Sequence, residues 1–573
     1  MADYDKAIAV RPDSAEAFND RGLVLRRLNR FADAMDSFER ATKLKSDHAA
    51  AFNNLGFTLH KLGRFQEAIQ SYQLALAVAP DFIEALNNLG VTLHRVNRFE
   101  EALAVYDRAL AINANSSEAL CNRGQVLLVR GEIRQAIDSL RRAAAIGDNS
   151  AVHSAFIFAL NFDPSATAAV KQSERSKWAQ RYGAPLRRPH SFQADTANNR
   201  RLRIGYLSSY FRRNAATYSF GGVITNHERE KFEIVCYSDT TIRDDVTDLI
   251  RRRADAWRET SGMSDEELAD LIRKDRIDIL VDPVGHMAGN RLLVFARKPA
   301  PVQVTGWGEP TGTGLPEMDY LLADKMLVPD QERALLAERI IQLPNFLGYW
   351  MPDVIPPSRG LPAMERGYVT FGSFNRLEKL SADTLSTWAV LLRKVPTARL
   401  FLKDRALENV AEKTRLTHFF ANNGVSAERL TFLAESEIAA HLSAYQEIDI
   451  GLDPFPHSGG MTTLDALWMG IPVVTWAGQT ISSRLAASSL AALRLNSFIA
   501  DDLDTYVDIA VAASNDIVGL SGLRSILRDR LAASEFGAPV QYCRAVENAY
   551  TDIWHRWRDA RVMPRSVHDH RAD

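Results

Sequence analysis

Hydrophobic and small residues recur with a fixed period in the first quarter of the chain. Four segments align without gaps, beginning "AFNDRGLVL", "AFNNLGFTL", "ALNNLGVTL" and "ALCNRGQVL". Their equivalent glycines are spaced 34 residues apart, and a large side chain follows each glycine at a constant distance. These positions are Gly22, Gly56, Gly90 and Gly124, followed by Phe38, Tyr72, Tyr106 and Leu140. The pattern predicts repeated pairs of helices, in which each glycine lets the first helix approach the second and the large residue fills the gap.

This period and its alternation of small and large residues resemble the tetratricopeptide repeat, which stacks helix pairs into a superhelix with a concave surface. We expect this array over residues 1–148, with a half repeat before four full ones. One equivalent position, two residues before each glycine, is occupied by Asp20, Asn54, Asn88 and Asn122. These side chains either satisfy local backbone groups or form an amide ladder that grips the main chain of an acceptor peptide.

After residue 148 the period is lost, and we expect a helical linker over residues 149–200. From Arg203 short β-rich runs alternate with helical stretches, in two series separated by a Pro-rich break near 352–362. Such alternation predicts parallel sheets covered by helices. We therefore expect two doubly wound lobes with a cleft between them, at residues 201–360 and 361–540, and a closing helix and tail over 541–573.

Composition narrows the class of protein. The formal net charge of −2 leaves no basic footprint for nucleic acid, and 46% hydrophobic residues fit a globular protein. Three scattered cysteines provide neither a disulfide framework nor a zinc site. No apolar run is long enough to span a membrane, and the first residues lack the order of a signal peptide. We expect a cytoplasmic protein without nucleic-acid or membrane partners.

The stretch "DPFPHSGGMTTLDALWMG", residues 453–470, follows a strand-like run and leads into a helix. Ser458–Thr463 therefore lies at a helix entrance, where unpaired N–H groups suit a phosphate. Asp465 either accepts hydrogen bonds from ribose hydroxyls or caps the helix. Lys379, in "FGSFNRLEKLS", faces a diphosphate or is an ordinary surface lysine. Because the sequence contains no metal constellation, we expect Lys379 and backbone dipoles to neutralise a departing diphosphate.

Taken in order, the tetratricopeptide repeats, "RIGYLSSYF", "IDILVDPVGHMAGN", "PAPVQVTGWGEPTGTGLPEMDYLLAD", "VTFGSFNRLEKLS" and "LDPFPHSGGMTTLDALWMGIPVVTWAG" resemble the O-GlcNAc transferase/SPINDLY family. The resemblance implies an inverting glycosyltransferase of GT-B fold, with an α-solenoid preceding a two-lobed α/β region. Details such as "TGLP" and "GHMAGN" are nearer to the SPINDLY branch, whose plant member uses GDP-fucose, than to animal O-GlcNAc transferase, which uses UDP-GlcNAc.

The resemblance also implies roles for single residues. Lys379 matches the lysine that contacts the donor diphosphate, His441 matches the histidine that stacks on the nucleobase, and Asp465 matches the ribose-binding carboxylate. The remaining donor-binding positions are those of the phosphate loop and of the stretch before Lys379: Ser458, Gly459, Gly460, Met461, Thr462, Thr463, Asn375 and Arg376.

The chain departs from the family pattern at the histidine proposed as a base or acceptor-positioning group. "GYLSSYFRRN" puts Asn214 there, and an amide does not take up a proton. Tyr218, Asp275, Asp282 and His286 are the alternative candidates, and His286 faces the cleft if the fold is as expected. Alternatively no dedicated base is needed, because a strongly dissociated sugar–diphosphate bond demands little of the nucleophile and the proton leaves through water.

The sequence thus predicts a metal-independent, inverting transferase without a cofactor. It moves GlcNAc or fucose from a nucleotide-sugar to Ser or Thr of proteins held by the repeat array. Two alternatives remain open: a transferase dedicated to one partner such as a flagellin or an adhesin, with another sugar or acceptor residue, and a scaffold that binds nucleotide-sugar with impaired turnover.

Overall fold

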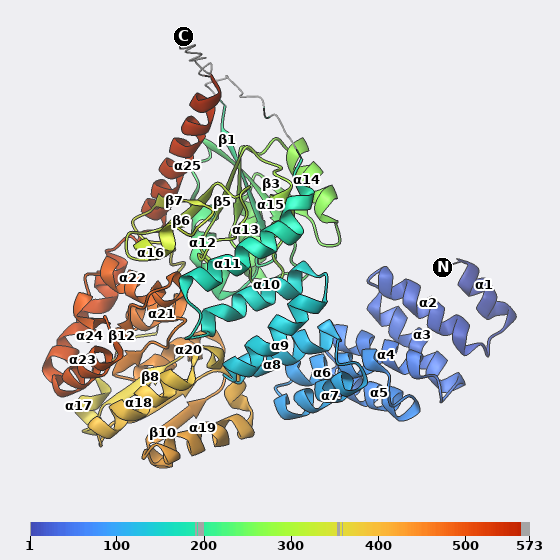
Figure 1. The fold of residues 1–573 in the computed structure, drawn as a ribbon, viewed down its shortest axis with the longest axis horizontal. Coiled ribbons are helices and arrows are strands. Elements are labelled where there is room, and N and C mark those ends of the chain that lie inside the picture. The colour runs from blue at the N-terminus through green and yellow to red at the C-terminus, as the bar shows by residue number, and fades with distance from the viewer. Residues whose placement is uncertain (1, 189–191, 193–199, 352–355, 358, 563–573) are drawn as a thin grey trace, which may run out of the picture. The chain divides into compact units, whose positions relative to one another are not determined.

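The computed structural model describes residues 2–188, 192, 200–351, 356–357 and 359–562 (Figure 1). These residues form two compact units, one comprising the described residues up to Phe156 with Glu408–Glu412 and the other the remaining described residues. Residues 189–191 and 193–199 near the end of the predicted linker, part of the Pro-rich break and the tail after residue 562 lie outside the described residues.

The first unit is a series of helices that pack in consecutive pairs, one pair for each predicted repeat. It contains α1 (Ala2–Val10), α2 (Ala15–Arg27), α3 (Phe31–Leu44), α4 (Ala49–Lys61), α5 (Phe65–Val78), α6 (Ile83–Arg95), α7 (Phe99–Ile112), α8 (Ser117–Val129) and α9 (Ile133–Ile146), followed by α10 (Ser150–Ala159), which ends in the second unit. The predicted half repeat is α1, and the four full repeats run from α2 to α9.

Close contact at the repeat glycines holds each pair together. A Cβ added to Gly90 would lie 2.4 Å from Tyr106 Cζ, and one added to Gly56 would lie 2.7 Å from Tyr72 Cε1. Tyr72 and Tyr106 are buried, with 1% and 0% of their surface exposed. The predicted packing of a ring against each of these two glycines is confirmed, and it explains why this position excludes a side chain.

The second unit contains two sheets in which every paired strand is parallel. The first sheet has the order β3-β2-β1-β4-β5-β6-β7 and consists of β1 (Leu202–Ser208), β2 (Phe232–Ser238), β3 (Ala256–Glu259), β4 (Ile279–Asp282), β5 (Val302–Thr305), β6 (Tyr320–Ala323) and β7 (Arg339–Gln342). The second has the order β10-β9-β8-β11-β12-β13 and consists of β8 (Thr370–Ser373), β9 (Arg399–Lys403), β10 (Leu430–Leu433), β11 (Ile450–Leu452), β12 (Val473–Trp476) and β13 (Ile499–Ala500). The two doubly wound lobes expected from the sequence are confirmed.

Helices follow the strands in each lobe. Before and within the first lobe these are α11 (Ala168–Trp178), α12 (Ala215–Asn226), α13 (Asp245–Arg253), α14 (Asp265–Lys274), α15 (Leu292–Ala296) and α16 (Asp330–Arg333). The second lobe contains α17 (Pro362–Arg366), α18 (Ala382–Lys394), α19 (Val410–Asn422), α20 (Ile438–Ala444), α21 (Met461–Trp468), α22 (Leu485–Ala492), α23 (Leu503–Asn515) and α24 (Ile517–Ala532). The closing helix is α25 (Pro539–Val562).

Helix α25 follows the second lobe in sequence but packs beside the strands of the first (Figure 1). Trp307 Nε1 donates to Tyr542 Oη at 3.0 Å, and His227 Nδ1 lies 3.0 Å from Glu547 Oε1. Burial lowers the pKa of His227 to about 3, so its imidazole is neutral at physiological pH. Cys543 completes a cluster with His227 and Glu547 whose polar atoms lie within 4.8 Å of one another. The last helix is thereby fixed to the first lobe by buried polar contacts.

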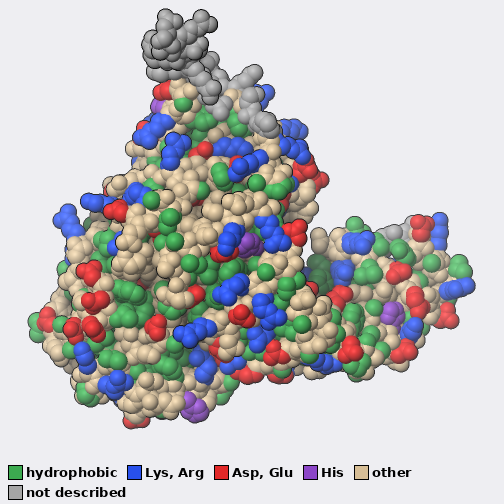
Figure 2. Space-filling model, in the orientation of Figure 1, with side chains coloured by type: hydrophobic (Ala, Val, Ile, Leu, Met, Phe, Trp, Pro, Cys, Tyr) green, Lys and Arg blue, Asp and Glu red, His purple; other side chains and the backbone are tan. Residues whose placement is uncertain are grey.

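On the face shown in Figure 2, basic and acidic side chains are interspersed over the surface. This mixture agrees with the near balance of charge in the sequence. Within the described residues, no helix combines the length and the apolar character that crossing a bilayer requires.

The repeat packing predicts the effect of one methyl group. We expect Gly90→Ala to destabilise the array by about 1–3 kcal/mol, because the added Cβ collides with the buried ring of Tyr106. Urea unfolding followed by circular dichroism measures this loss. Gly522→Ala in α24 is the matched control: its Cβ meets nothing within 4 Å, so we expect it to stabilise that helix by about 0.5–1 kcal/mol. Equal effects of the two substitutions would contradict the packing account.

Candidate functional site

The loop between β11 and α21, which we call the donor loop, is held in place by hydrogen bonds that its backbone N–H groups donate. The Gly459 N–H donates to Asp453 Oδ1 at 2.6 Å, and the Ser458 N–H donates to the Ser482 carbonyl at 2.9 Å. The second carboxylate oxygen of Asp453 accepts from Thr475 Oγ1 at 2.6 Å. Ser458 and Gly459, which the sequence placed among the phosphate donors, therefore use their N–H groups to shape the loop.

The next three N–H groups are available. Helix α21 begins at Met461 with Gly460 as its N-cap, and no side chain caps it. Within the part of the chain that the structure describes, the N–H groups of Gly460, Met461 and Thr462 have no protein acceptor. Unpaired N–H groups at a helix entrance attract an anion. The sequence predicted a phosphate-binding segment over Ser458–Thr463. The N–H groups that remain available are those of residues 460–462, which we call the anion cradle.

The two glycines of the loop have different roles. A Cβ on Gly459 would lie 2.6 Å from Thr463 Oγ1 and 2.8 Å from Thr462 Oγ1, so the protein itself leaves no space there. A Cβ on Gly460 would meet only Leu347 Cδ2, at 3.8 Å. The absence of a side chain at Gly460 therefore leaves the space beside the free N–H groups open.

Lys379 reaches this loop from a short 3₁₀ turn after β8. Its Nζ donates to the Ser458 carbonyl at 2.7 Å, and 9% of the residue is exposed. Burial and the neighbouring Arg376 guanidinium lower the pKa of Lys379 to about 8, against the attraction of Asp453. Among the described side chains, no carboxylate lies within ion-pair distance of its ammonium. The lysine thus brings a poorly compensated positive charge to the anion cradle.

Asn375 and Arg376, which precede Lys379, differ in burial and in their partners. Asn375 is buried, and its Oδ1 accepts from Thr462 Oγ1 at 2.9 Å. Arg376 keeps 58% of its side chain exposed and forms an ion pair with Glu378 at 2.7 Å. Asn375 therefore supports the cradle, whereas Arg376 adds charge at its rim.

Asp465 lies one turn into α21 and accepts a hydrogen bond from Tyr349 Oη at 2.8 Å. Burial raises the pKa of Asp465 to about 7, and the bond from Tyr349 opposes this shift. Sequence reasoning missed Tyr349, because it comes from the segment after the first lobe, 116 residues earlier. A carboxylate with one oxygen held in this way has its other oxygen left to accept from a ligand hydroxyl.

His441 lies on α20 among aromatic rings. Its centroid is 5.8 Å from that of Phe374 and 5.6 Å from that of Tyr445, both in edge contacts. Lys403 Nζ lies 3.1 Å from His441 Nδ1. Burial and the charge of Lys403 lower the pKa of His441 to about 4. Sequence reasoning missed Lys403, although its position at the carboxyl end of a strand was a usable signal.

In the first lobe, Asn214 is the N-cap of α12 and accepts from the Ala216 N–H at 2.8 Å. Tyr218 lies one turn further along, with its ring in edge contact with Trp350. Burial raises the pKa of Tyr218 above its ordinary value, so its phenol stays protonated at neutral pH. Neither group is a base at that pH.

The other candidate bases are engaged by the protein. Asp275 lies at the end of α14, where Arg258 pairs with it at 3.1 Å and Tyr237 Oη donates to it at 2.8 Å. Asp282 accepts from the N–H groups of Val284 and Gly285, both at 3.0 Å. These carboxylates stabilise their own surroundings, which the sequence did not reveal.

His286 is 1% exposed, and its Nε2 lies 2.9 Å from the Thr313 carbonyl. A carbonyl only accepts, so Nε2 carries the hydrogen. Its ring also makes an edge contact with Trp178. This histidine packs into the first lobe, contrary to the expectation that it faces the cleft.

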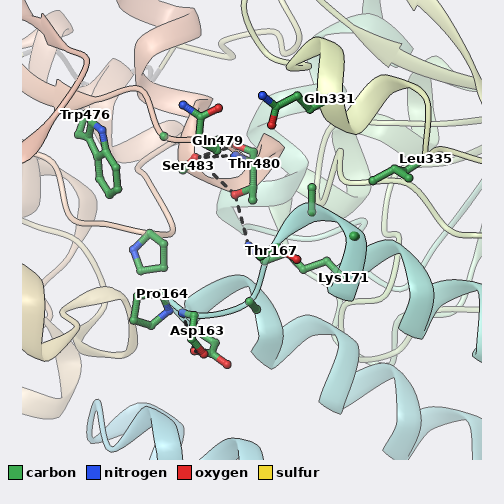
Figure 3. Close-up of a pocket in the computed structure, with 16 residues that line it drawn as sticks. Asp163, Pro164, Thr167, Lys171, Gln331, Leu335, Trp476, Gln479, Thr480 and Ser483 are labelled. Atoms are coloured by element: carbon green, nitrogen blue, oxygen red, sulfur yellow. Dashed lines mark hydrogen bonds between the residues drawn. The ribbon is translucent and has the colours of Figure 1, made fainter.

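A cavity of about 450 Å³ borders the donor loop between the start of α11, α16 and the segment after β12 (Figure 3). Thr480 and Ser483 form one side of the cavity and Thr167 another (Figure 3), and Pro456, from the loop between β11 and α21, also lines it. The Lys171 Nζ donates to Ser482 Oγ at 3.1 Å. Since the Ser482 carbonyl holds Ser458, helix α11 supports the donor loop from the side of this cavity.

In the repeat array, two side chains of the predicted amide ladder bond to the preceding repeat, each to the residue just before the ladder position there. Asn54 Nδ2 donates to Asn19 Oδ1 at 2.9 Å, and Asn88 Nδ2 donates to Asn53 Oδ1 at 3.0 Å, each in the preceding repeat. Asp20 is exposed and Asn122 is half-buried. At least two of these side chains therefore link neighbouring repeats.

Comparison with known proteins agrees with this architecture. Residues 153–354 and 350–546 match the family described as Glycosyl transferase family 41, and tetratricopeptide-repeat families match within residues 22–151. The chain is 31% identical over 412 residues to a probable UDP-N-acetylglucosamine–peptide N-acetylglucosaminyltransferase SPINDLY of Solanum lycopersicum, covering 71% of this chain and 44% of that protein. For the Arabidopsis thaliana SPINDLY protein the identity is 33%, covering 65% and 42%. The chain thus spans less than half the length of these relatives.

A solved structure of a mutant Thermobaculum terrenum O-GlcNAc transferase superposes on this chain with a TM-score of 0.83 at 32% identity. The alignment covers 90% of this chain and 99% of that one. The family match extends over more than half of the chain and includes both lobes. The chain therefore belongs to glycosyl transferase family 41.

Proposed function

We propose that the protein is a metal-independent, inverting O-glycosyltransferase that moves a monosaccharide from a nucleotide-sugar to Ser or Thr of proteins. One observation carries the proposal: the loop whose N–H groups at residues 460–462 have no acceptor among the described residues also holds the buried ammonium of Lys379, through the Ser458 carbonyl. This arrangement suits a diphosphate, the group that leaves when the sugar is transferred. The names of the relatives point to UDP-GlcNAc, and the SPINDLY-like motifs also admit GDP-fucose.

Charge neutralisation is the main contribution of the second lobe. As the bond between the sugar and the diphosphate breaks, negative charge grows on the departing oxygen. Lys379 and the N–H groups of residues 460–462 stabilise that charge without reorganising, since they are already fixed. Asp465 accepts from the ribose, and His441 stacks on the base. No metal ion is needed in this scheme.

The acceptor proton leaves through water in this proposal. Tyr218 is protonated at neutral pH, Asp275 and Asp282 are engaged, and Asn214 takes up no proton. A bond to a well-stabilised diphosphate dissociates far before the hydroxyl attacks, and the hydroxyl then needs little activation. The hydroxyl oxygen bonds to the anomeric carbon from the face opposite the leaving group, and this inverts the configuration.

The repeat array supplies binding energy for acceptor proteins. Proximity gained by binding flanking residues lowers the barrier at a reacting hydroxyl. The amide nitrogens of Asn54 and Asn88 bond to the preceding repeats, and Asn54 Oδ1 accepts from Arg26 Nη1 at 3.2 Å. We therefore propose that the acceptor main chain donates to other, exposed side-chain oxygens of the array. A transferase dedicated to one flagellin or adhesin, and a scaffold with impaired turnover, remain the alternatives that the assay below separates.

Transfer is tested directly by incubating the protein with UDP-GlcNAc, GDP-fucose and other nucleotide-sugars in the presence of EDTA. Intact-mass spectrometry of candidate acceptors then detects a sugar-sized shift. We expect transfer or slow donor hydrolysis with at least one donor, and a loss of about 10²-fold or more in Lys379→Ala. A folded wild-type protein inactive with every donor would support the scaffold alternative, and full activity of Lys379→Ala would refute the role of this lysine.

The lowered pKa of Lys379 predicts how nucleotide affinity depends on pH. A bound diphosphate stabilises the protonated lysine, so its pKa in the complex lies above the value of about 8 in the free protein. Loss of the lysine's proton therefore makes the affinity fall above pH 8, by about tenfold between pH 7 and pH 9. Isothermal titration of UDP or GDP measures this, with Lys379→Arg as the control that keeps its charge. A parallel fall in Lys379→Arg would assign the titration to another group.

Substitution of Asn214 tests whether the reaction proceeds without a general base at this position. We expect Asn214→Ser to keep turnover within about threefold, because serine is an equally good N-cap and the amide takes no part in proton transfer. A general base contributes about 10²–10⁴-fold, so a loss of that size would show that Asn214 acts on the reacting hydroxyl. Initial rates with the best donor provide the measurement.

A further inference from the structure

Lys403 is a buried lysine beside the proposed nucleobase site. It is the last residue of β9, at the carboxyl edge of the second sheet, where ligands of such sheets bind. Only 4% of the residue is exposed. Its Nζ lies 3.1 Å from Nδ1 of His441, the residue proposed to stack on the base.

This contact fixes the state of the histidine. An ammonium only donates, so Nδ1 of His441 accepts and the ring hydrogen is on Nε2. The positive charge at 3.1 Å also keeps the imidazole from being protonated. The other rings around it, Phe374 and Tyr445, bear no charge. The stacking surface is therefore a neutral ring with an ammonium at its edge.

The ammonium has donor capacity beyond this bond. It carries three N–H groups, and the described residues provide one hydrogen-bond acceptor for it, His441 Nδ1. Glu435 and Asp404 attract it from a distance, and neither forms an ion pair with it within the described ranges. Asp404 is itself occupied by the Ala406 N–H, at 2.8 Å. A ligand stacked on His441 thus meets unused N–H donors at its edge.

We propose that Lys403 selects the nucleobase by donating to the carbonyl oxygen at position 4 of a pyrimidine or position 6 of a purine. The site then accepts bases with oxygen at the pyrimidine 4 or purine 6 position, uracil or guanine, and disfavours cytosine and adenine, which carry an amine there. An amine facing a buried ammonium sets donor against donor, and both lose hydrogen bonds to water without compensation. The inference rests on the proposed function, since it concerns the donor nucleotide of the same site.

The experiment is isothermal titration of the full chain at pH 7 with UDP, CDP, GDP and ADP. We expect UDP to bind more tightly than CDP or GDP more tightly than ADP, by about tenfold or more. Lys403→Met should reduce the preference to within about threefold, mainly by weakening the oxo nucleotide, while Lys403→Arg should keep it. Lys394→Met is the matched control, because that lysine is half-exposed and pairs with Asp508 on α23.

Two results would overturn the inference. One is a wild-type protein that binds the oxo and amino nucleotides equally, and the other is a Lys403→Met variant, or Lys403→Gln should that variant not fold, that keeps the full preference. Failure of all four nucleotides to bind the folded wild-type protein would instead refute the proposed function. Binding with lost discrimination and binding that is absent are therefore distinguishable.

Discussion

The hydrogen bond from Lys379 Nζ to the Ser458 carbonyl is the contact on which the proposed site depends. It joins the turn after β8 to the loop after β11, and so brings a charged side chain to the entrance of α21. A buried ammonium that forms no ion pair with any described carboxylate is costly in a free protein. A dianionic ligand that binds the adjacent N–H groups would offset this cost, because its negative charge attracts the ammonium.

Several other bonds keep that loop in shape. Ser381 Oγ and Thr384 Oγ1 both donate to the Phe455 carbonyl, at 2.8 and 2.7 Å, and Asp453 holds the Gly459 N–H. These partners come from separate segments of the second unit, and Lys171 adds a contact from α11 through Ser482. A cradle fixed in this way does not need to rearrange when charge develops, which is the condition for electrostatic stabilisation.

The two lobes contribute unequally to the proposed reaction. In the second, the N–H groups of residues 460–462 and the ammoniums of Lys379 and Lys403 retain donors that no described residue accepts. In the first, Asp275, Asp282 and His286 are engaged by neighbouring groups. This asymmetry fits the proposal that the chain stabilises the leaving group and does little to activate the nucleophile, in keeping with an asparagine at the position where the family pattern has a histidine.

The sequence predicted those features that depend on local pattern. The repeat glycines, the two series of parallel strands and the helix entrance within Ser458–Thr463 each follow from spacing and residue type along one segment. Tyr349 could not be found in this way, because its contact with Asp465 joins segments far apart in the chain. The strand end at Lys403 could be predicted, but its contact with His441 could not, for the same reason. For the same reason the sequence did not show that the Gly459 N–H is used within the loop, or that the Asn54 amide bonds to the preceding repeat.

The most direct test of the central claim is a crystal structure of the protein with bound UDP or GDP. The account predicts that phosphate oxygens lie within hydrogen-bond distance of Lys379 Nζ and of the N–H groups of Gly460, Met461 and Thr462, with no metal ion between them. Density for the diphosphate elsewhere, or a metal ion bridging it to the protein, would contradict the account.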